Sequence, residues 1–165
     1  NWGVQYNDLL VMANEYGKDI ELASALWKED IRECKILANL IVPAENMKAD
    51  IAEMWVEQTP QQEIAEMLAT NLLQYIDAAP QLCFRWIASD RSLYRICGFN
   101  ILSKLLANGK EPDERGINEC LDQINTALHD TDKSVAHAAY NCLNRFCELG
   151  IEYEKLAKQA IPDFC

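Results

Sequence analysis

Residues 86–109 read WIASDRSLYRICGFNILSKLLANG, and most of this stretch has the pattern of an amphipathic helix. Its apolar side chains recur at spacings of three and four residues, which places them on one face of a helix; they are Leu93, Ile96, Cys97, Ile101 and Leu105. Asp90 precedes this apolar stripe and Gly109 closes it, because glycine adopts the left-handed backbone conformation of a helix end at little cost. The stretch therefore predicts a helix between Asp90 and Gly109.

The same pattern repeats on both sides of this stretch. Apolar residues at helical spacing, separated by short turns, predict nine further helices. They cover residues 8–16, 20–27, 29–42, 46–58, 60–79, 81–89, 113–129, 133–149 and 152–160. No segment shows the sustained alternation of apolar and polar residues that is typical of a strand. The expected fold class is therefore all-α, with about ten helices.

Residues that favour helix ends mark several of these boundaries. Gly17 and Pro43 are predicted to stop helices, and Asp19 is predicted to cap the helix that follows Gly17. The segment 59–62, TPQQ, is predicted to start a helix with Thr59 as its N-cap and proline at the first helical position. Gln62 would then complete a capping box with Thr59.

The spacing of the helices predicts a repeat architecture. Successive helix pairs are separated by roughly 35–45 residues, the period of HEAT-type and armadillo-type repeats. No repeated sequence signature accompanies this spacing, so a compact helical bundle is the alternative. We favour an α-solenoid because the predicted helices are short, whereas a bundle is built from long antiparallel helices. The length fits a single domain over residues 1–165, since roughly 100–200 residues per domain is usual.

Charge is distributed unevenly along the chain. Lys and Arg total 15 against 26 Asp and Glu, which gives a formal net charge of −11. Residues 1–66 hold 5 basic and 13 acidic side chains, residues 67–110 hold 5 and 2, and residues 111–165 hold 5 and 11. An acidic protein is repelled by DNA at long range, because phosphate binding depends on Lys and Arg. The basic central segment can form a local positive patch, or it can belong to ordinary solvated helix faces.

Nothing in the sequence predicts a membrane protein. No apolar run approaches the roughly 18 residues of a membrane span, and no signal-peptide pattern is present. The seven cysteines form no CxxC pair and lie mostly among apolar helix positions, where free cysteine acts as a small hydrophobic residue. This use of cysteine predicts a reducing, cytoplasmic location. Because the sequence starts without methionine in what reads as the approach to a helix, we expect further residues upstream.

We also expect no metal and no cofactor, because no motif for a nucleotide, a metal or a cofactor is recognisable. His129 and His137, with Asp130 and Asp132 beside them, suggest a metal site, but the two histidines fall in different predicted helices. Asp130 and Asp132 are better explained as helix-end and helix-cap residues. The four tryptophans lie in amphipathic segments and are expected to pack rather than to stack on bases; they are at positions 2, 27, 55 and 86.

The central stretch also carries a more specific pattern. Residues 86–90, WIASD, lead to Leu93-Tyr94-Arg95 and then to the apolar helix ICGFNILSKLL. This pattern resembles the DNA alkylation repair family, which consists of HEAT-like repeat DNA glycosylases. Other matching pieces are residues 2–5 (WGVQ), 20–27 (IELASALW), 31–41 and 132–146 (DKSVAHAAYNCLNRF). The resemblance runs from residue 2 to about residue 150, and we expect the family's N-terminal helices to lie outside this sequence.

The resemblance implies a curved α-solenoid whose concave face holds duplex DNA. Members of the family remove purines alkylated at N3 or N7, and such a base is already cationic, so it leaves without a general acid. A carboxylate near the sugar stabilises the developing positive charge and directs water. Aromatic rings beside the lesion favour the cationic base, and an arginine holds the phosphate backbone.

Carried onto this sequence, the resemblance assigns four candidate site residues. Arg95 matches the family's arginine, and Glu66 falls where the family has its catalytic aspartate. Gln62 and Asn141 fall at the two positions where the family has tryptophan. Both aromatic walls are therefore replaced, and the carboxylate is displaced by one methylene, where a shift of about 1 Å can cost about 10²-fold in rate. The resemblance also implies that the four side chains converge on one concave surface.

Three of the candidates have a purely structural explanation as well. Gln62 can close the capping box with Thr59, and Glu66 can be a surface carboxylate one helical turn later. Arg95 can form a structural ion pair with Asp90 or Glu66.

Three functions are consistent with these observations. The first is a DNA glycosylase in which Glu66 is the catalytic carboxylate and Arg95 holds phosphate. The second is a non-catalytic solenoid that binds duplex DNA. The third is a protein-interaction scaffold that binds a basic partner on its concave face, since both end segments are acidic. The loss of both aromatic residues favours a protein that resembles the DNA alkylation repair enzymes but lacks efficient base excision.

Overall fold

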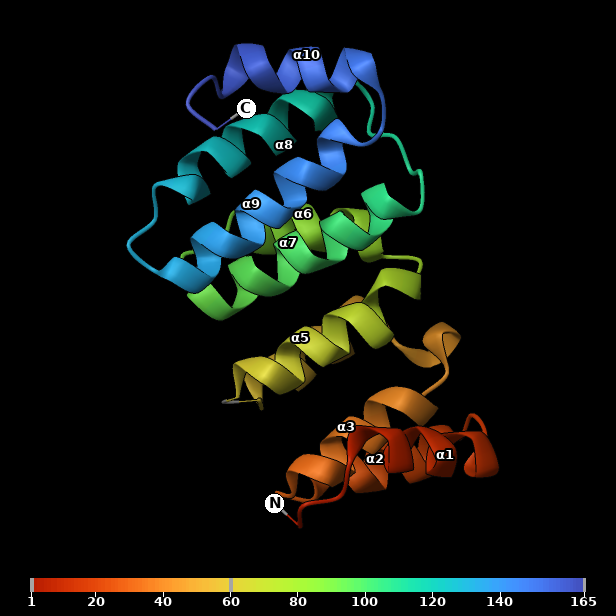
Figure 1. Ribbon diagram of the computed structural model, residues 1–165. Helices are drawn as coiled ribbons and strands as arrows, with labels where there is room; N and C mark the ends of the chain where they lie inside the picture. The colour runs from red at the N-terminus through yellow and green to blue at the C-terminus, as the bar shows by residue number, and fades with distance from the viewer. Residues whose placement is uncertain (1, 60, 165) are drawn as a thin grey trace. The chain divides into compact units, whose positions relative to one another are not determined.

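The computed structural model describes residues 2–59 and 61–164, and within them it contains ten α-helices, two 3₁₀ turns and no strand (Figure 1). The prediction of an all-α chain with about ten helices is confirmed. In this described part, no helix is long and apolar enough to cross a membrane. The chain divides into two compact units, Asn1–Ala79 and Pro80–Cys165. The expectation of one domain over residues 1–165 stays a prediction.

The first unit is organised around one buried helix, α3. Its elements are α1 (Tyr6–Tyr16), α2 (Ile20–Lys28), α3 (Arg32–Ile41), η1 (Ala44–Asn46), α4 (Ala49–Glu57), α5 (Gln62–Asn71) and η2 (Leu73–Tyr75). Helix α3 packs against α1, α2 and α5, and seven of its ten residues are buried. This helix is enclosed on several sides because its neighbours in sequence and in space each bury one face against it.

Two stacked indole rings lie in the core of the first unit. Trp27 of α2 and Trp55 of α4 have ring centroids 4.2 Å apart and planes that differ by 4°. Each is at most 4% exposed. The Nε1–H of Trp27 donates to Oε1 of Gln58 at 2.9 Å, so the polar atom of this ring has a partner. The prediction that these two tryptophans pack in the core is confirmed.

The second unit is organised around α9. Its elements are α6 (Ala79–Ile87), α7 (Ser92–Ala107), α8 (Glu114–Leu128), α9 (Lys133–Cys147) and α10 (Ile151–Ala160). Helix α9 packs against α7, α8 and α10, and it lies beside α7 in Figure 1. Gly98 of α7 lies so near α6 that a Cβ there would be 2.8 Å from the backbone nitrogen of Ile87. Helices α6 and α7 therefore form a closely packed pair.

Several predicted helix ends are confirmed by their hydrogen bonds. Gly17 has a φ of 69° and its N–H donates to the oxygen of Ala13. The Asp19 carboxylate accepts from the N–H of Leu22 at 3.0 Å and caps α2. Helix α3 ends at Ile41, two residues before Pro43.

Other predicted boundaries are wrong. The helix expected from Glu29 begins at Arg32, because the N–H of Glu29 bonds back to Leu26 at the end of α2. The helix expected over residues 60–79 ends at Asn71, because Leu72 leaves the helical conformation, with φ of −131° and ψ of −57°. Pro80 does not precede a new helix but lies in the first turn of α6, where proline is tolerated.

The capping box expected at residues 59–62 is also absent. The Thr59 hydroxyl donates to the oxygen of Trp55 at 2.9 Å, so it closes the end of α4 and does not cap α5. Helix α5 begins at Gln62, and its N-cap residue Gln61 makes no side-chain capping bond. Pro60 lies outside the described residues. The hydroxyl of Thr59 is drawn into the end of α4 because the residue is 1% exposed and needs a buried acceptor.

Three cysteine side chains come together in the core of the second unit, from α6, α8 and α9. Cys83, Cys120 and Cys142 are free thiols and are buried. Burial raises the pKa of the Cys83 thiol to about 12. A hydrogen bond with Cys142, together with burial, raises the pKa of Cys120 as well. The thiols of Cys83 and Cys120 therefore stay protonated at neutral pH, and all three buried cysteines act as small apolar residues.

Candidate nucleic-acid interface

Two of the candidate residues contact each other on α5. Gln62 and Glu66 lie one turn apart, and Nε2 of Gln62 donates to Oε1 of Glu66 at 2.9 Å. Gln62 is exposed and Glu66 is half-buried. The explanation of Gln62 as part of a capping box is therefore wrong, because its amide reaches forward to Glu66. The Glu66 carboxylate, which the resemblance matches to the family's aspartate, thus accepts a hydrogen bond from a neutral amide of its own helix.

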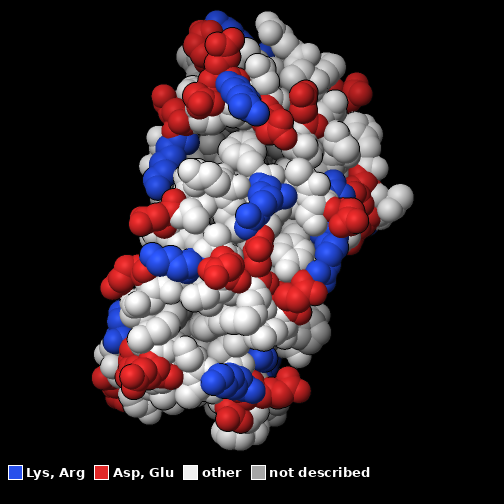
Figure 2. All heavy atoms as spheres, turned by 180° about the vertical axis from the view of Figure 1, so that it is seen from behind, with Lys and Arg blue, Asp and Glu red and all other residues white. Residues whose placement is uncertain are grey.

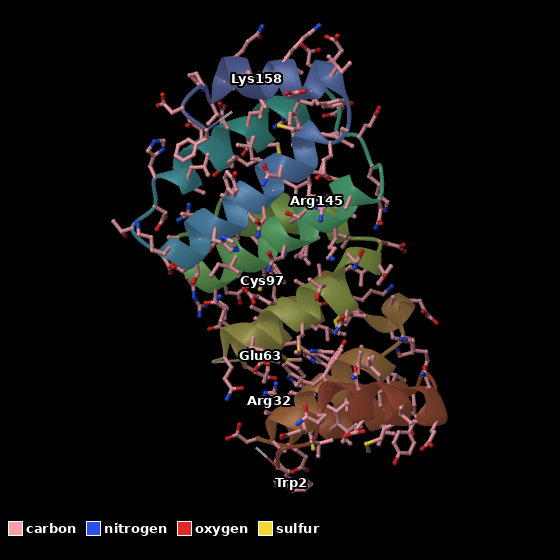
Figure 3. All side chains as sticks on the ribbon, viewed as in Figure 1. Trp2, Arg32, Glu63, Cys97, Arg145 and Lys158 are labelled. Atoms are coloured by element: carbon pink, nitrogen blue, oxygen red, sulfur yellow. The ribbon has the colours of Figure 1, made fainter. Side chains whose placement is uncertain are left out.

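The start of α5 is fixed to α3 by a two-point ion pair. Nε of Arg32 donates to Oε2 of Glu63 at 3.0 Å, and Nη2 donates to Oε1 of the same carboxylate (Figure 3). This hydrogen bonding lowers the pKa of Glu63. Helix α5 itself contains the two carboxylates Glu63 and Glu66 and no Lys or Arg. Its charge therefore does not favour a polyanion.

Arg95 is bound to a residue that the sequence did not suggest. Its Nη1 donates to Oδ2 of Asp130, and the two side chains are 15% and 20% exposed. The prediction that Arg95 forms an ion pair is confirmed, but the predicted partners, Asp90 and Glu66, are wrong. The bond joins the first turn of α7 to the turn between α8 and α9.

Asp130 also organises the start of α9. Its Oδ1 accepts from the N–H of Asp132 at 2.8 Å, and Oδ1 of Asp132 accepts from the N–H of Ser134 at 2.9 Å. The backbone N–H of Asp132 is the main cause that lowers the pKa of Asp130, and the Arg95 guanidinium adds to it. The predictions of Asp130 as a helix-end residue and Asp132 as a cap are confirmed. Arg95 is thus placed next to the N-terminal end of α9, where backbone dipoles favour an anion.

The outer side of α9 forms a continuous polar surface, which we call the α9 face. Exposed residues recur along it at spacings of three and four residues, so they share one side of the helix; they are Lys133, His137, Tyr140, Asn141, Asn144 and Arg145. Nδ2 of Asn141 lies 3.3 Å from Nε2 of His137. Tyr140 is 44% exposed. Sequence reasoning identified only Asn141 on this surface, although the same spacing was readable for the other five residues.

Charge separates by helix within the second unit. Helices α7 and α9, which pack against each other, contain no Asp or Glu, and neither does α6, whereas α8 contains three acidic residues and α10 contains two. Arg145 of α9 is paired with Glu148, just after the helix, at 2.8 Å. In the view from behind, acidic and basic side chains are intermingled (Figure 2). The absence of carboxylates from both α7 and α9 is therefore a property of these helices and not of the whole surface.

The candidate residues thus fall into two groups. Gln62 and Glu66 lie together in the first unit, and Arg95 and Asn141 lie on the adjacent helices α7 and α9 of the second unit. Their convergence on one concave surface stays a prediction.

The remaining aromatic and ligand-forming residues add no further site. Trp86 is 2% exposed and meets Tyr94 edge to face, as expected of a packing residue. Trp2 is 73% exposed, so the expectation that it packs is wrong, and its backbone N–H bonds to Glu33 at 2.9 Å. Over residues 2–59 and 61–164, no group of three or more His, Cys, Asp or Glu side chains is placed to hold a metal.

Comparisons with known proteins agree on the kinship of the chain. The chain has 19% sequence identity and a TM-score of 0.87 to a solved structure from "a new family of proteins related to the HEAT-like repeat DNA glycosylases with affinity for branched DNA structures". The match covers 99% of this chain and 70% of that one, and it confirms the HEAT-like helical repeat fold. No curated protein sequence matches. The sequence model of the family described as DNA alkylation repair enzyme matches residues 1–161, and the chain therefore belongs to the DNA alkylation repair enzyme family.

Proposed function

We propose that this protein binds DNA through the α9 face and the adjoining first turn of α7, and that contacts with phosphates supply most of the affinity. The observation that carries the proposal is that α7 and α9 contain no acidic residue in a chain that has 26. The charged and amide side chains that these two packed helices offer to a phosphate backbone are therefore Lys, Arg, His and Asn, and the nearby carboxylates Asp130, Asp132 and Glu148 lie in the flanking turns. Membership of a DNA alkylation repair family supports DNA as the polyanion.

Arg95 and Asn141 have defined parts in this proposal. The guanidinium of Arg95 carries five N–H donors, and its bond to Asp130 uses Nη1, so other donors can reach a phosphate oxygen. The amide of Asn141 is exposed beside His137 and can donate to phosphate or sugar oxygens. Such contacts hold the nucleic acid in place but do not read its sequence. We therefore expect binding with little sequence preference.

The proposal does not include efficient base excision. Gln62 and Asn141 replace the two aromatic residues that the family places beside the lesion, and neither amide offers a π face to a cationic base. The Glu66 carboxylate is displaced by one methylene relative to aspartate and is already bonded to Gln62. Glu66 thus supplies a carboxylate of the type that stabilises the sugar cation. The aromatic groups that would hold the base beside it are replaced.

The test of DNA binding removes two positive charges from the α9 face. In Lys133→Gln/Arg145→Gln, we expect the affinity for a fluorescein-labelled duplex to fall about tenfold, and the slope of log affinity against log salt to fall by about 1 to 2. The structural relative is described as having affinity for branched DNA structures, so a branched junction is measured beside the duplex. Fluorescence anisotropy over a range of salt concentrations gives both quantities.

The matched control is Lys155→Gln/Lys158→Gln on α10, which also removes two positive charges. These lysines are paired with Glu152 and Glu154 much as Arg145 is paired with Glu148. We expect its DNA affinity to stay within about twofold of the unchanged protein, because its charges lie outside the α9 face. Equal losses in both double variants would show that net charge alone sets the affinity, and DNA binding at the α9 face would then be rejected.

Base excision is tested separately with Glu66→Gln. We expect the unchanged protein and the variant to release the same amount of methylated purine from alkylated duplex DNA as a protein-free sample. Both should retain their DNA affinity, because α5 is not part of the α9 face. Chromatography of the released bases gives the result. Release by the unchanged protein that the variant abolishes would establish Glu66 as a catalytic carboxylate and overturn this part of the proposal.

A further inference from the structure

A second surface of the same unit has the opposite character. Between α6 and α8 lies an open groove of about 520 Å³. Its lining comes from the first two turns of α6 and from the start of α8 with the residues before it; the lining residues are Pro80, Gln81, Phe84, Pro112, Asp113, Arg115, Gly116 and Glu119. We call it the α6–α8 groove. It lies wholly within the second unit.

The floor of the groove is apolar and partly open to solvent. Phe84, Pro112 and Gly116 are each half-buried. A side chain at Gly116 would crowd the groove, because a Cβ there would lie 3.0 Å from Cβ of Pro112 and 3.2 Å from Oδ1 of Asp113. The groove therefore offers a ring and proline carbons to an apolar side chain of modest size, with no side chain of α8 filling the space at position 116.

Three charged side chains line the groove, the carboxylates of Asp113 and Glu119 and the guanidinium of Arg115. The segment around them is acidic, since residues 111–122 contain five carboxylates and this one arginine. Asp113 and Glu119 each use one carboxylate oxygen locally, Asp113 in accepting from the N–H of Gly116 at 2.8 Å and Glu119 in accepting from Gln123 at 3.2 Å. Their other oxygens can accept from a cationic ligand. Because carboxylates outnumber the arginine in this segment, it repels phosphate, and the groove does not suit the nucleic acid proposed for the α9 face.

We propose that the α6–α8 groove docks a short basic peptide segment, with one apolar side chain placed against Phe84 and with flanking lysine or arginine side chains at Asp113 and Glu119. The apolar floor supplies the anchor and the carboxylates select positive charge, which is the arrangement of a polar rim around a hydrophobic centre. The proposal is independent of DNA binding, since it uses α6 and α8 and none of the α9 face. On this proposal, the carboxylates of residues 111–122 serve to bind a basic protein partner.

The probe for this site is a short fluorescein-labelled peptide with a central leucine and two lysines on each side. We expect the unchanged protein to bind it, and to bind forms with glutamate in place of lysine or serine in place of leucine at least about tenfold more weakly. Glu119→Lys should weaken the lysine peptide about fivefold, with a larger effect at low salt. Phe84→Ala should weaken it about tenfold by removing the apolar contact.

One control variant separates binding at the groove from a general effect of charge. Glu152→Lys makes the same charge change on α10, where the side chain is 81% exposed, and should leave peptide affinity within about twofold of the unchanged protein. Glu119→Lys changes an exposed side chain, so it keeps the test valid if Phe84→Ala unfolds the protein. No binding of the lysine peptide, or binding that Glu119→Lys and Glu152→Lys weaken equally, would refute the groove as a peptide site.

Discussion

Replacement of Trp27 by alanine is expected to lower the free energy of unfolding by about 3–5 kcal/mol, the range for removing a buried aromatic side chain. Trp27 is 3% exposed and stacks on Trp55 at 4.2 Å, so the truncation opens a cavity beside the second ring. It also removes the donor to Gln58. Each of these losses acts at the contact between α2 and α4, which lies in the core of the first unit.

A buried lysine adds to this expected cost. Lys35 is 8% exposed, its Nζ lies 4.5 Å from the centroid of the Trp27 ring, and it donates to the Trp27 carbonyl oxygen at 2.8 Å. The ring therefore stabilises a largely desolvated ammonium group by a cation–π contact. Trp27→Ala keeps the backbone carbonyl that accepts the hydrogen bond from Lys35 but removes the ring. The Lys35 ammonium therefore loses its cation–π contact while it stays buried.

The effect is measured by urea denaturation followed by circular dichroism. Trp2→Ala is the control, because it removes the same ring from a residue that is 73% exposed, and it should change the free energy of unfolding by less than about 0.5 kcal/mol. If Trp27→Ala costs less than about 1 kcal/mol, the stacked pair is not a main source of stability in the first unit.

The number and order of the helices are predictable from the sequence because each helix carries its own apolar stripe. In α7, Ile96, Cys97, Ile101 and Leu105 of the predicted stripe are at most 4% exposed, and Leu93 at its start is half-buried. The helical spacing is recognised without long-range information. It does not show that Phe99, Leu102 and Leu106, outside the stripe, are buried as well. The repeat architecture follows less directly, because the spacing of helix pairs also fits a bundle.

The errors in helix boundaries arise where local patterns allow two backbone conformations. Leu72, Leu73 and Ile76 continue the apolar stripe of α5 and are all buried, yet the chain passes through a 3₁₀ turn there. Apolar spacing does not distinguish one further helical turn from a 3₁₀ turn that buries the same side chains. Thr59 is a similar case, because its hydroxyl can serve the end of one helix or the start of the next.

The sequence identified candidate site residues, but it did not show which residues they bind. Arg95 and Asp130 are 35 residues apart, and no local pattern joins them. The only signal in the sequence was that Asp130 lies two residues before the cap Asp132, and such a residue can accept from the backbone of the turn. The acid-free character of α7 and α9 was also present in the sequence. It became informative only when the two helices were seen to pack together.

Replacement of Gly98 by valine is expected to lower the free energy of unfolding by about 3 kcal/mol, at the upper end of the usual cost of overpacking. A Cβ at position 98 would lie 2.8 Å from the backbone nitrogen of Ile87 and 2.9 Å from the backbone oxygen of Cys83. Both atoms belong to the backbone of α6, so they cannot rotate away as a side chain can. Relief requires α6 and α7 to separate, which loosens the contact between two helices of the second unit.

The intrinsic helix propensities predict a much smaller effect, and this difference makes the test decisive. Glycine has a lower helix propensity than valine in the middle of a helix. Propensity alone would therefore make Gly98→Val neutral, or stabilising by roughly 0.3 kcal/mol. The control is Ala107→Val, which introduces valine at the last, exposed residue of the same helix. It should lower the free energy of unfolding by less than about 0.7 kcal/mol, the cost from helix propensity. Urea denaturation of both variants separates the two causes. A Gly98→Val protein as stable as the unchanged one would mean that α6 and α7 do not approach each other at Gly98 as closely as described.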